Sequence, residues 1–263
     1  MRENRLRQIW QEGGAVLNGW LHLPDAYAAE VMANAGWDSL TIDMQHGPVG
    51  YESAVPMLQA ISTTNTVPLA RVPWNEPGII MKMLDAGCYG IICPMVNSRA
   101  ECETFVGACR YPPMGYRSNG INRVKYYAGS GYFEQANDTI VTMAMIETAA
   151  ALQNIDDILS VPGLDALYIG PSDLSISLGQ TKGVTYTAPP LSDAVEAIIA
   201  SAQKHNIVLG AHTSSSADAL YLIGKGFQFV TVGSDARLLT GGSQEIVTAV
   251  KGSQSTQKAS GPY

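Results

Sequence analysis

Short apolar runs alternate with helical patterns along nearly the whole chain, and this alternation constrains the fold more than any other feature. A buried parallel strand reads as a continuous apolar run, whereas a helix repeats its apolar residues every three to four positions. Eight such units in 263 residues predict a single-domain (β/α)8 TIM barrel, which typically takes about 250 residues. The predicted strands are Ala15–Leu21, Ser39–Asp43, Val67–Val72, Gly90–Met95, Val141–Glu147, Ala166–Gly170, Ile207–Ala211 and Phe229–Gly233.

An open, doubly wound sheet is the alternative α/β architecture. It would prefer fewer strands and usually a glycine-rich turn after the first strand. Gly13 and Gly14 precede the first predicted strand instead of following it, so the chain lacks a dinucleotide-binding fingerprint. The barrel is expected to span residues 1–251, with a last helix from about Asp235 to Val250. The polar segment 252–263 is predicted to be a frayed tail.

Composition and charge indicate which classes of partner to expect. The net charge is −7 with a pI of about 5.0, and the basic residues are scattered, so no nucleic-acid surface is expected. No apolar run reaches the roughly 18 residues of a membrane span, and the start of the chain lacks a signal-peptide pattern. A cytoplasmic protein without membrane contact is expected. The cysteines lack C-x-x-C spacing, which favours buried thiols over a zinc or redox motif: Cys88, Cys93, Cys102 and Cys109.

Two acidic residues stand at the ends of two predicted strands. Glu147 closes one apolar run, and Asp173 follows another, Ala166–Gly170. The carboxyl ends of parallel strands form the mouth where ligands bind in α/β folds. Two hard oxygen ligands at one mouth are suited to a divalent cation. The alternative is that each acid only caps the following helix, since Asp is favoured at N-caps and Glu in first turns.

Three further polar residues follow the second and third predicted strands. Asp43 and His46 lie three positions apart in one loop, and a histidine beside an aspartate at a strand end is a candidate for acid–base chemistry. Arg71 ends an apolar strand, where a guanidinium in the mouth needs an anionic partner such as a substrate carboxylate or an enolate oxygen. An internal bridge from Arg71 to an acid such as Glu147 is the structural alternative.

Together these side chains favour the chemistry of an enolate. A cation held by Glu147 and Asp173 would bind the carboxylate and keto oxygen of a 2-oxo acid and stabilise negative charge on the enolate oxygen. Arg71 would add positive charge near that oxygen, and His46, or water held by it, would move the proton. Backbone N–H donors for the carboxylate are expected from Gly170, Pro171, Ser172 and Asp173, especially if a helix starts at Asp173.

Competing functions find less support in the sequence. A Schiff-base aldolase needs a lysine at a strand end, but each lysine falls in a predicted helix, loop or tail. The run Ser214–Ser216 lacks the context of a hydrolase nucleophile, and the neighbouring His212 is interpreted as a strand-end polar residue. A catalytically silent ligand-binding barrel would need the mouth residues to be purely structural. The lysines are Lys82, Lys125, Lys182, Lys204, Lys225, Lys251 and Lys258.

Several stretches resemble the HpcH/HpaI aldolase family, from about residue 5 to residue 250. The resemblance implies a (β/α)8 barrel and a class II pyruvate aldolase that uses Mg²⁺, Mn²⁺ or Co²⁺. Such an enzyme cleaves 4-hydroxy-2-oxo acids reversibly to pyruvate, or a close 2-oxo acid, and an aldehyde. A related fungal branch, macrophomate synthase, implies the alternative of an oxaloacetate decarboxylase or enolate-coupling enzyme. The matching stretches are Trp37–Pro48, Arg71–Asn75, Met83–Val96, Tyr111–Ser118, Met145–Thr148 and Tyr168–Ser175.

The resemblance also assigns roles to individual residues. The metal ligands of the family fall on Glu147 and Asp173, its substrate-oxygen arginine on Arg71, and its catalytic histidine on His46, with Asp43 close by. The family pairs that histidine with an acid that matches Asp85. Asp85 ends a predicted helix at the wrong end of the barrel for a same-chain contact, which implies action across a subunit interface. The resemblance further implies homo-oligomers, as hexamers of paired trimers with an exchanged C-terminal helix.

Two stretches break the strand–helix rhythm. Residues 111–137 are rich in Gly, Tyr and Asn, and they include Arg117, Arg123 and Lys125. A second, shorter insertion at Thr181–Pro190 follows the sixth predicted strand. Long loops in compact domains are usually functional or interface-forming, so both are expected to cover a site, and the first is expected to recognise the aldehyde.

Overall fold

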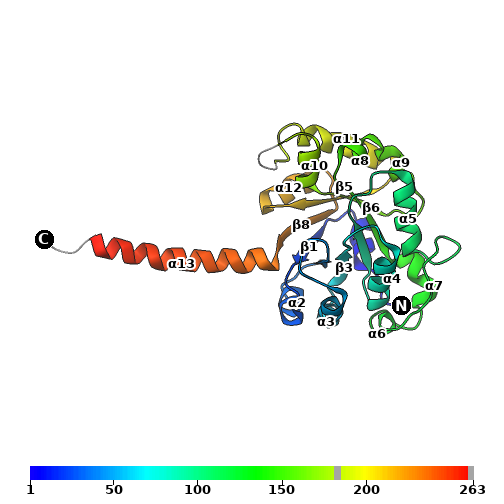
Figure 1. Cartoon of the computed structure of the whole chain (residues 1–263), viewed down its shortest axis with the longest axis horizontal. Coiled ribbons are helices and arrows are strands. Elements are labelled where there is room, and N and C mark those ends of the chain that lie inside the picture. Colours follow the sequence, from blue (N-terminus) through cyan, green and yellow to red (C-terminus); the bar gives the residue numbers. More distant parts are fainter. Residues whose placement is uncertain (181–184, 260–263) are drawn as a thin grey trace.

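The described residues, 1–180 and 185–259 with side chains as far as 252, form a closed barrel of eight parallel strands in the computed structural model (Figure 1). Each strand pairs with its sequence neighbours, and β8 pairs with β1. The predicted (β/α)8 barrel is thus confirmed, and the open sheet is excluded. The strands are β1 (Val16–Leu21), β2 (Ser39–Asp43), β3 (Val67–Arg71), β4 (Gly90–Cys93), β5 (Val141–Ile146), β6 (Ala166–Ile169), β7 (Val208–Thr213) and β8 (Phe229–Ser234).

Helices surround the barrel, and some of them begin or end at capping residues that the sequence supplies. Asp25 caps α2 by accepting a hydrogen bond from the N–H of Ala28 at 2.7 Å, and Gly87, with φ 118°, closes α4 in the left-handed conformation. The predicted helix over 149–159 is two helices, α8 and α9, which meet at Asn154. The helices are α1 (Arg5–Gln11), α2 (Ala26–Ala33), α3 (Tyr51–Ile61), α4 (Pro77–Ala86), α5 (Arg99–Cys109), α6 (Val124–Ala128), α7 (Tyr132–Thr139), α8 (Ala149–Gln153), α9 (Ile155–Leu159), α10 (Pro171–Ser177), α11 (Leu191–His205), α12 (Ser216–Gly224) and α13 (Asp235–Ala259).

Burial explains why the strands read as continuous apolar runs. All residues of β2, β4, β5 and β6 are buried, because one face of each strand fills the barrel and the other lies under helices. The four cysteines are buried and free, which confirms the prediction of structural thiols. No helix in the described ranges combines the length and the apolar character that crossing a membrane requires.

Strand register places three residues at one level of the barrel mouth. Ile146 pairs with Ile169, and Ile169 pairs with Ala211, across β5, β6 and β7. The next residue along each strand is Glu147, Gly170 or His212. These three positions therefore lie side by side at the carboxyl ends of neighbouring strands, and Gly170 contributes no side chain between the other two.

The segment 111–137 differs from the predicted covering loop. It contains α6 and most of α7, and it joins α5 to β5, so it lies at the amino ends of the strands beside the chain's N-terminus (Figure 1). Arg117 in this segment pairs with Asp85 at 2.6 Å. The expectation that the segment covers the mouth of its own barrel was wrong, because a connection from a helix to a strand runs to the opposite end.

The last helix, α13, is longer than expected and projects away from the barrel (Figure 1). It continues through Ala259, beyond the expected end near Val250. The helix leaves the barrel between α2 and α12 and packs mainly against β1 and β8. Leu17 on β1 is 40% exposed, whereas the other residues of this strand are buried.

Candidate active site

A cavity of about 310 Å³ opens at the carboxyl ends of the strands, where the sequence places its candidate residues. Arg71, Glu147 and His46 line it together with the segment Gly170–Asp173. Asp43 lies directly beneath, as a fully buried side chain at the end of β2. The structure thus brings together all the predicted site residues except Asp85.

Asp43 and Arg71 form a bidentate ion pair at the base of the cavity. Arg71 donates from Nε to Oδ1 of Asp43 at 2.9 Å and from Nη2 to Oδ2 at 2.7 Å. Burial alone would raise the pKa of Asp43, but hydrogen bonds from His22 and Arg71 and the charge of Arg71 outweigh it and hold the pKa well below the ordinary 3.8. Asp43 therefore stays ionised and orients Arg71. The internal bridge considered as an alternative exists, with Asp43 rather than Glu147 as the partner of Arg71.

The guanidinium of Arg71 is held on a second side by an aromatic ring. Its central carbon lies 4.9 Å from the ring centroid of Trp20, within the range of a cation–π contact. The Arg71 side chain is 11% exposed, and its Nη1 has no hydrogen-bond partner among the described residues. This geometry fixes a positive group at the cavity wall with one nitrogen left for an anionic ligand.

Glu147 is a buried carboxylate with one satisfied oxygen. Its Oε1 accepts a hydrogen bond from the N–H of Met95 at 2.7 Å, and no described residue donates to Oε2. A Cβ atom at Gly170 would lie 2.4 Å from Oε2, so the carboxylate needs glycine at that position. Burial raises the pKa of Glu147, the Met95 N–H lowers it, and the neighbouring charge of Asp173 raises it further.

The donor set at Glu147 and Asp173 fits a divalent cation. Within residues 1–180 and 185–259, no group of three or more His, Cys, Asp or Glu side chains is arranged to hold a metal by itself. Mg²⁺ needs no such group, since it is usually bound by one or two carboxylates together with water and substrate oxygens. A cation here would also offset the burial of Glu147 and its repulsion by Asp173.

The helix beside these carboxylates starts earlier than the sequence suggests. α10 begins at Pro171, with Gly170 as its N-cap at φ −89° and ψ 89°, and not at Asp173. Because Pro171 has no N–H, it cannot serve as the expected donor. The first-turn donors that face outward from the helix start are the N–H groups of Ser172 and Asp173.

The histidine side chain that contacts Asp43 is one that the sequence did not single out. His46 is exposed, and only its backbone N–H contacts Asp43, at 3.3 Å from Oδ1. Instead, His22 places Nε2 at 3.0 Å from Oδ2 of Asp43. The loop that carries His22 is held by Asp235, which accepts hydrogen bonds from the N–H groups of His22 and Leu23 at 2.8 and 3.0 Å. The only sequence signal for His22 is its position directly after an apolar strand.

His212 is the second histidine that sequence reasoning did not place in the site. It lies in β7, lines the cavity, and puts Nδ1 at 3.1 Å from Oη of Tyr168. Burial and the positive charge of Arg71 lower the pKa of His212 to about 4, so the imidazole is neutral near pH 7. Tyr186 donates to the His212 carbonyl, so the predicted 181–190 insertion reaches the site, although residues 181–184 lie outside the described ranges.

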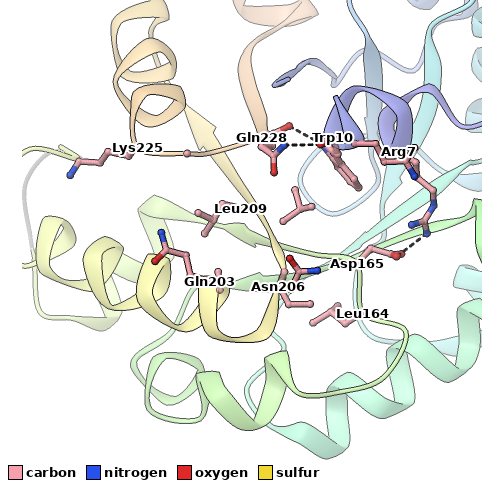
Figure 2. A pocket seen from close by; sticks show the side chains of 14 residues that line it. Arg7, Trp10, Leu164, Asp165, Gln203, Asn206, Leu209, Lys225 and Gln228 are labelled. Atoms are coloured by element: carbon pink, nitrogen blue, oxygen red, sulfur yellow. Dashed lines mark hydrogen bonds and ion pairs between the residues drawn. The ribbon is translucent and has the colours of Figure 1, made fainter. Parts of the chain in front are cut away.

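Asp85 and the lysines stand apart from this cavity. Asp85 ends α4 at the opposite end of the barrel, where it is paired with Arg117. No lysine lines the mouth cavity in the part of the chain that the structure describes, which agrees with the argument against a Schiff base; Lys182 and the side chain of Lys258 lie outside that part. A larger cavity of about 620 Å³ opens at the amino ends of the strands (Figure 2). There Asp165 already pairs with Arg7 at 2.8 Å, and Gln228 bonds the backbone of Trp10.

Comparisons with known proteins agree with this geometry. A family model described as HpcH/HpaI aldolase/citrate lyase matches residues 18–241. The hydroxypyruvate/pyruvate aldolase of Rhizorhabdus wittichii is 42% identical over 252 residues, which cover 93% of this chain and 97% of the relative. The 4-hydroxy-2-oxo-heptane-1,7-dioate aldolase of Salmonella dublin is 32% identical over 264 residues, covering 99% of this chain and 100% of the relative.

A solved structure extends the likeness to three dimensions. The crystal structure of an HpcH/HpaI aldolase/citrate lyase family protein from Burkholderia cenocepacia J2315 superposes with a TM-score of 0.87 at 26% identity. The superposition covers 94% of this chain and 99% of the other. These matches confirm the resemblance seen in the sequence, and the chain belongs to the HpcH/HpaI aldolase/citrate lyase family.

Proposed function

We propose that the protein is a divalent-metal-dependent aldolase that cleaves 4-hydroxy-2-oxo acids reversibly to pyruvate, or a close 2-oxo acid, and an aldehyde. The observation that carries this proposal is the convergence of Glu147, Asp173 and Arg71 on one cavity at the carboxyl ends of the strands. Two anionic groups and one fixed cation there match the needs of a bound 2-oxo acid. The names of the two aldolase relatives support the same reaction class.

Each side chain has a task in this reaction. Glu147 and Asp173 would hold Mg²⁺, Mn²⁺ or Co²⁺, which when bound supplies Lewis acidity toward the oxygens of the 2-oxo acid. Arg71, fixed by Asp43 and Trp20, presents Nη1 toward the oxygen that gains negative charge. The N–H groups of the α10 first turn would receive the substrate carboxylate.

Proton transfer is assigned to His46. Its imidazole is exposed at the rim of the cavity, and no described residue bonds to it, so it is free to meet the substrate or a water molecule. Its backbone is fixed by Asp43, which sets the position of the loop. Asp43 itself cannot take the proton, because its two oxygens already accept hydrogen bonds from four N–H groups besides His22. Two of these N–H groups belong to Arg71, and the others are the backbone N–H groups of Gln45 and His46.

Pyruvate release from a 4-hydroxy-2-oxo acid tests the proposal. Treatment with a chelator should abolish release, and Mg²⁺, Mn²⁺ or Co²⁺ should restore it. The variants Glu147→Gln and Asp173→Asn should need far more metal for activity, whereas Asp156→Asn, on the exposed surface, should not. Activity that survives chelation, or a lysine adduct trapped by borohydride in the presence of pyruvate, would refute the metal assignment.

The same residues also suit a second reaction. An enolate formed by loss of carbon dioxide from oxaloacetate would meet the same Arg71 and the same carboxylate pair, so decarboxylation or coupling of that enolate is the alternative function. Release of carbon dioxide discriminates poorly between the two, because an aldolase of this kind can also catalyse it. Cleavage of a carbon–carbon bond with stoichiometric appearance of an aldehyde supports the aldolase.

We further propose a homo-oligomer, a hexamer of paired trimers, with α13 exchanged between subunits. The projecting helix exposes Leu238, Leu239 and Ile246, and the barrel that it leaves exposes Leu17 on β1 and Leu220 on α12. A partner's α13 lying over β1 and β8 would bury both apolar surfaces. A chain ending at Thr240 should then be smaller by light scattering than the full chain; an unchanged assembly would refute the exchange.

Asp85 enters this scheme only through the assembly. Within one subunit its carboxylate is at the wrong end of the barrel and is neutralised by Arg117. We propose that Asp85 acts on His46 of a neighbouring subunit. Mixing inactive Asp85→Asn and His46→Asn chains after dissociation tests this, since shared sites would regain activity in mixed assemblies and separate sites would not.

A further inference from the structure

The cavity contains one hydrogen-bond acceptor that the proposed reaction does not use. His212 lines the cavity, and its Nδ1 is bonded to Tyr168. Its Nε2 has no hydrogen-bond partner among the described residues. His212 is half-buried and faces the cavity, so Nε2 is accessible to a ligand that carries a hydrogen-bond donor.

A buried polar chain fixes which ring nitrogen carries the proton. The hydroxyls of Ser39 and Thr41 donate to Oδ1 of Asn18 at 2.8 and 3.1 Å. The amide Nδ2 of Asn18 must then face the other way, and it donates to Oγ1 of Thr231 at 2.9 Å. Tyr168 donates its single hydroxyl proton to the same Oγ1 at 2.7 Å.

This chain leaves Oη of Tyr168 able only to accept from His212. The imidazole proton therefore sits on Nδ1, 3.1 Å from Oη, and Nε2 carries the lone pair. The pKa of His212, lowered by burial and by the charge of Arg71, agrees with a neutral ring. Trp20 meets the imidazole edge-on at a centroid distance of 5.2 Å and limits its rotation. The acceptor is thus preorganised.

The acceptor also lies next to the carboxylates. His212 is level with Glu147, two strands away, and the position between them is Gly170, which has no side chain. A 2-oxo acid held near Glu147 and Arg71 would extend its remaining atoms across Gly170 toward His212. Its carboxylate and keto oxygens can only accept hydrogen bonds, as Nε2 does. A hydroxyl is the substituent of such a substrate that can donate.

On the basis of the proposed function, we propose that His212 is a specificity-determining residue whose Nε2 accepts a hydrogen bond from a hydroxyl of the substrate. The hydroxyl has two possible sources. It is either a C3 hydroxyl on the 2-oxo acid nucleophile, as in hydroxypyruvate, or the C4 hydroxyl of the aldol. Both sources present the same donor to the same nitrogen, and kinetics can separate them.

The test compares two nucleophiles that differ by one hydroxyl. Aldol addition of hydroxypyruvate and of pyruvate to glycolaldehyde is measured for the wild type, His212→Leu and Tyr168→Phe, with His205→Leu on α11 as the matched loss of an imidazole. Tyr168→Phe keeps the ring but removes the oxygen that holds the proton on Nδ1. Exchange of the C3 protons of pyruvate in D2O, without aldehyde, reports separately on enolate formation.

With the C3 hydroxyl as donor, His212→Leu lowers the ratio of kcat/KM for hydroxypyruvate to that for pyruvate by about 10-fold. Tyr168→Phe lowers it less, and His205→Leu leaves it unchanged. With the C4 hydroxyl as donor, both additions and the cleavage reaction slow equally while proton exchange persists. The proposal would be overturned if His212→Leu kept both the ratio and the cleavage rate within about twofold of the wild type. It would also be overturned if this variant lost proton exchange together with both additions. Absence of exchange in the wild type would instead refute the proposed function.

Discussion

Replacement of Asp43 by Asn tests the ion pair on which the site depends. The amide keeps the shape of the side chain and one oxygen, but it turns the other oxygen into a donor that faces Nη2 of Arg71 and Nε2 of His22. Arg71 then loses its charge partner while 11% exposed. Breaking a buried ion pair by removing one charge costs about 3–5 kcal/mol of unfolding free energy. For a chain of this size, that corresponds to a Tm lower by roughly 6–20 °C.

Thermal unfolding followed by circular dichroism at pH 7 measures this loss. Asp156→Asn removes an exposed carboxylate that is paired with Lys204, and it should melt close to the wild type. Asp43→Asn should also lose most of its pyruvate release, because Arg71 is no longer oriented. A melting temperature within about 2 °C of the wild type would show that the Asp43–Arg71 pair does not stabilise the fold.

The stability that Asp43 contributes to the fold should depend on pH, and the same variant measures it. The pKa of Asp43 is lower in the folded protein than its ordinary 3.8, so the unfolded chain binds the proton more readily. The stabilisation from Asp43 is therefore complete above about pH 4–5 and is lost as the pH falls further. The difference in stability between wild type and Asp43→Asn should shrink on acidification. A difference that grows between pH 5 and pH 3 would contradict this linkage.

Four further substitutions test separate parts of the site. Arg71→Ala should lower kcat by about 10²–10³-fold, since it removes a preorganised positive group, and near-full activity would exclude that role. Gly170→Ala places a Cβ against Oε2 of Glu147 and should weaken metal binding in a calorimetric titration about 10–100-fold, whereas unchanged affinity would separate Glu147 from the metal. His46→Asn should lower kcat by about 10²-fold or more. A larger loss for His22→Asn would show that His22, and not His46, transfers the proton.

The barrel was predictable because its signal is repeated eight times. Each strand is buried on both faces, so each appears in the sequence as an apolar run, and errors of one or two residues at its ends do not alter the order of elements. The same repetition predicted the site, since any polar residue that ends such a run must lie at the mouth. Glu147, Arg71 and Asp43 were found in this way, and the family and aldolase predictions are confirmed by the relatives.

The failures concern contacts between elements distant in the sequence. His46 is three residues from Asp43, but the side chain that reaches Asp43 is His22, in the loop after the neighbouring strand β1. His212 acquires its role from Tyr168 and Thr231, which come from two other strands. Nothing local in the sequence marks these partners, because they depend on the register of the closed barrel.

A different error placed residues 111–137 over the mouth. Their composition resembles a loop, but α6 and α7 form there because Val124, Tyr127 and Tyr132 are buried against the rest of the fold. The order of helices and strands along the chain is enough to show at which end of the barrel α6 and α7 lie. The segment follows a helix and precedes a strand, and such connections lie at the amino ends of strands. The last helix was predicted to end near Val250, because the residues that follow are small and polar, whereas α13 continues through Ala259.

Asp235 links the projecting helix to the chemistry. It is the first residue of α13, and its carboxylate holds the loop whose His22 contacts Asp43, which in turn orients Arg71. A chain cut at Thr240 keeps Asp235 and this connection but loses the rest of the helix. Loss of activity in that chain would therefore report a need for the rest of α13, whereas loss in Asp235→Ala would report a need for the loop. The two variants together separate a need for the projecting part of α13 from a need for its first residue.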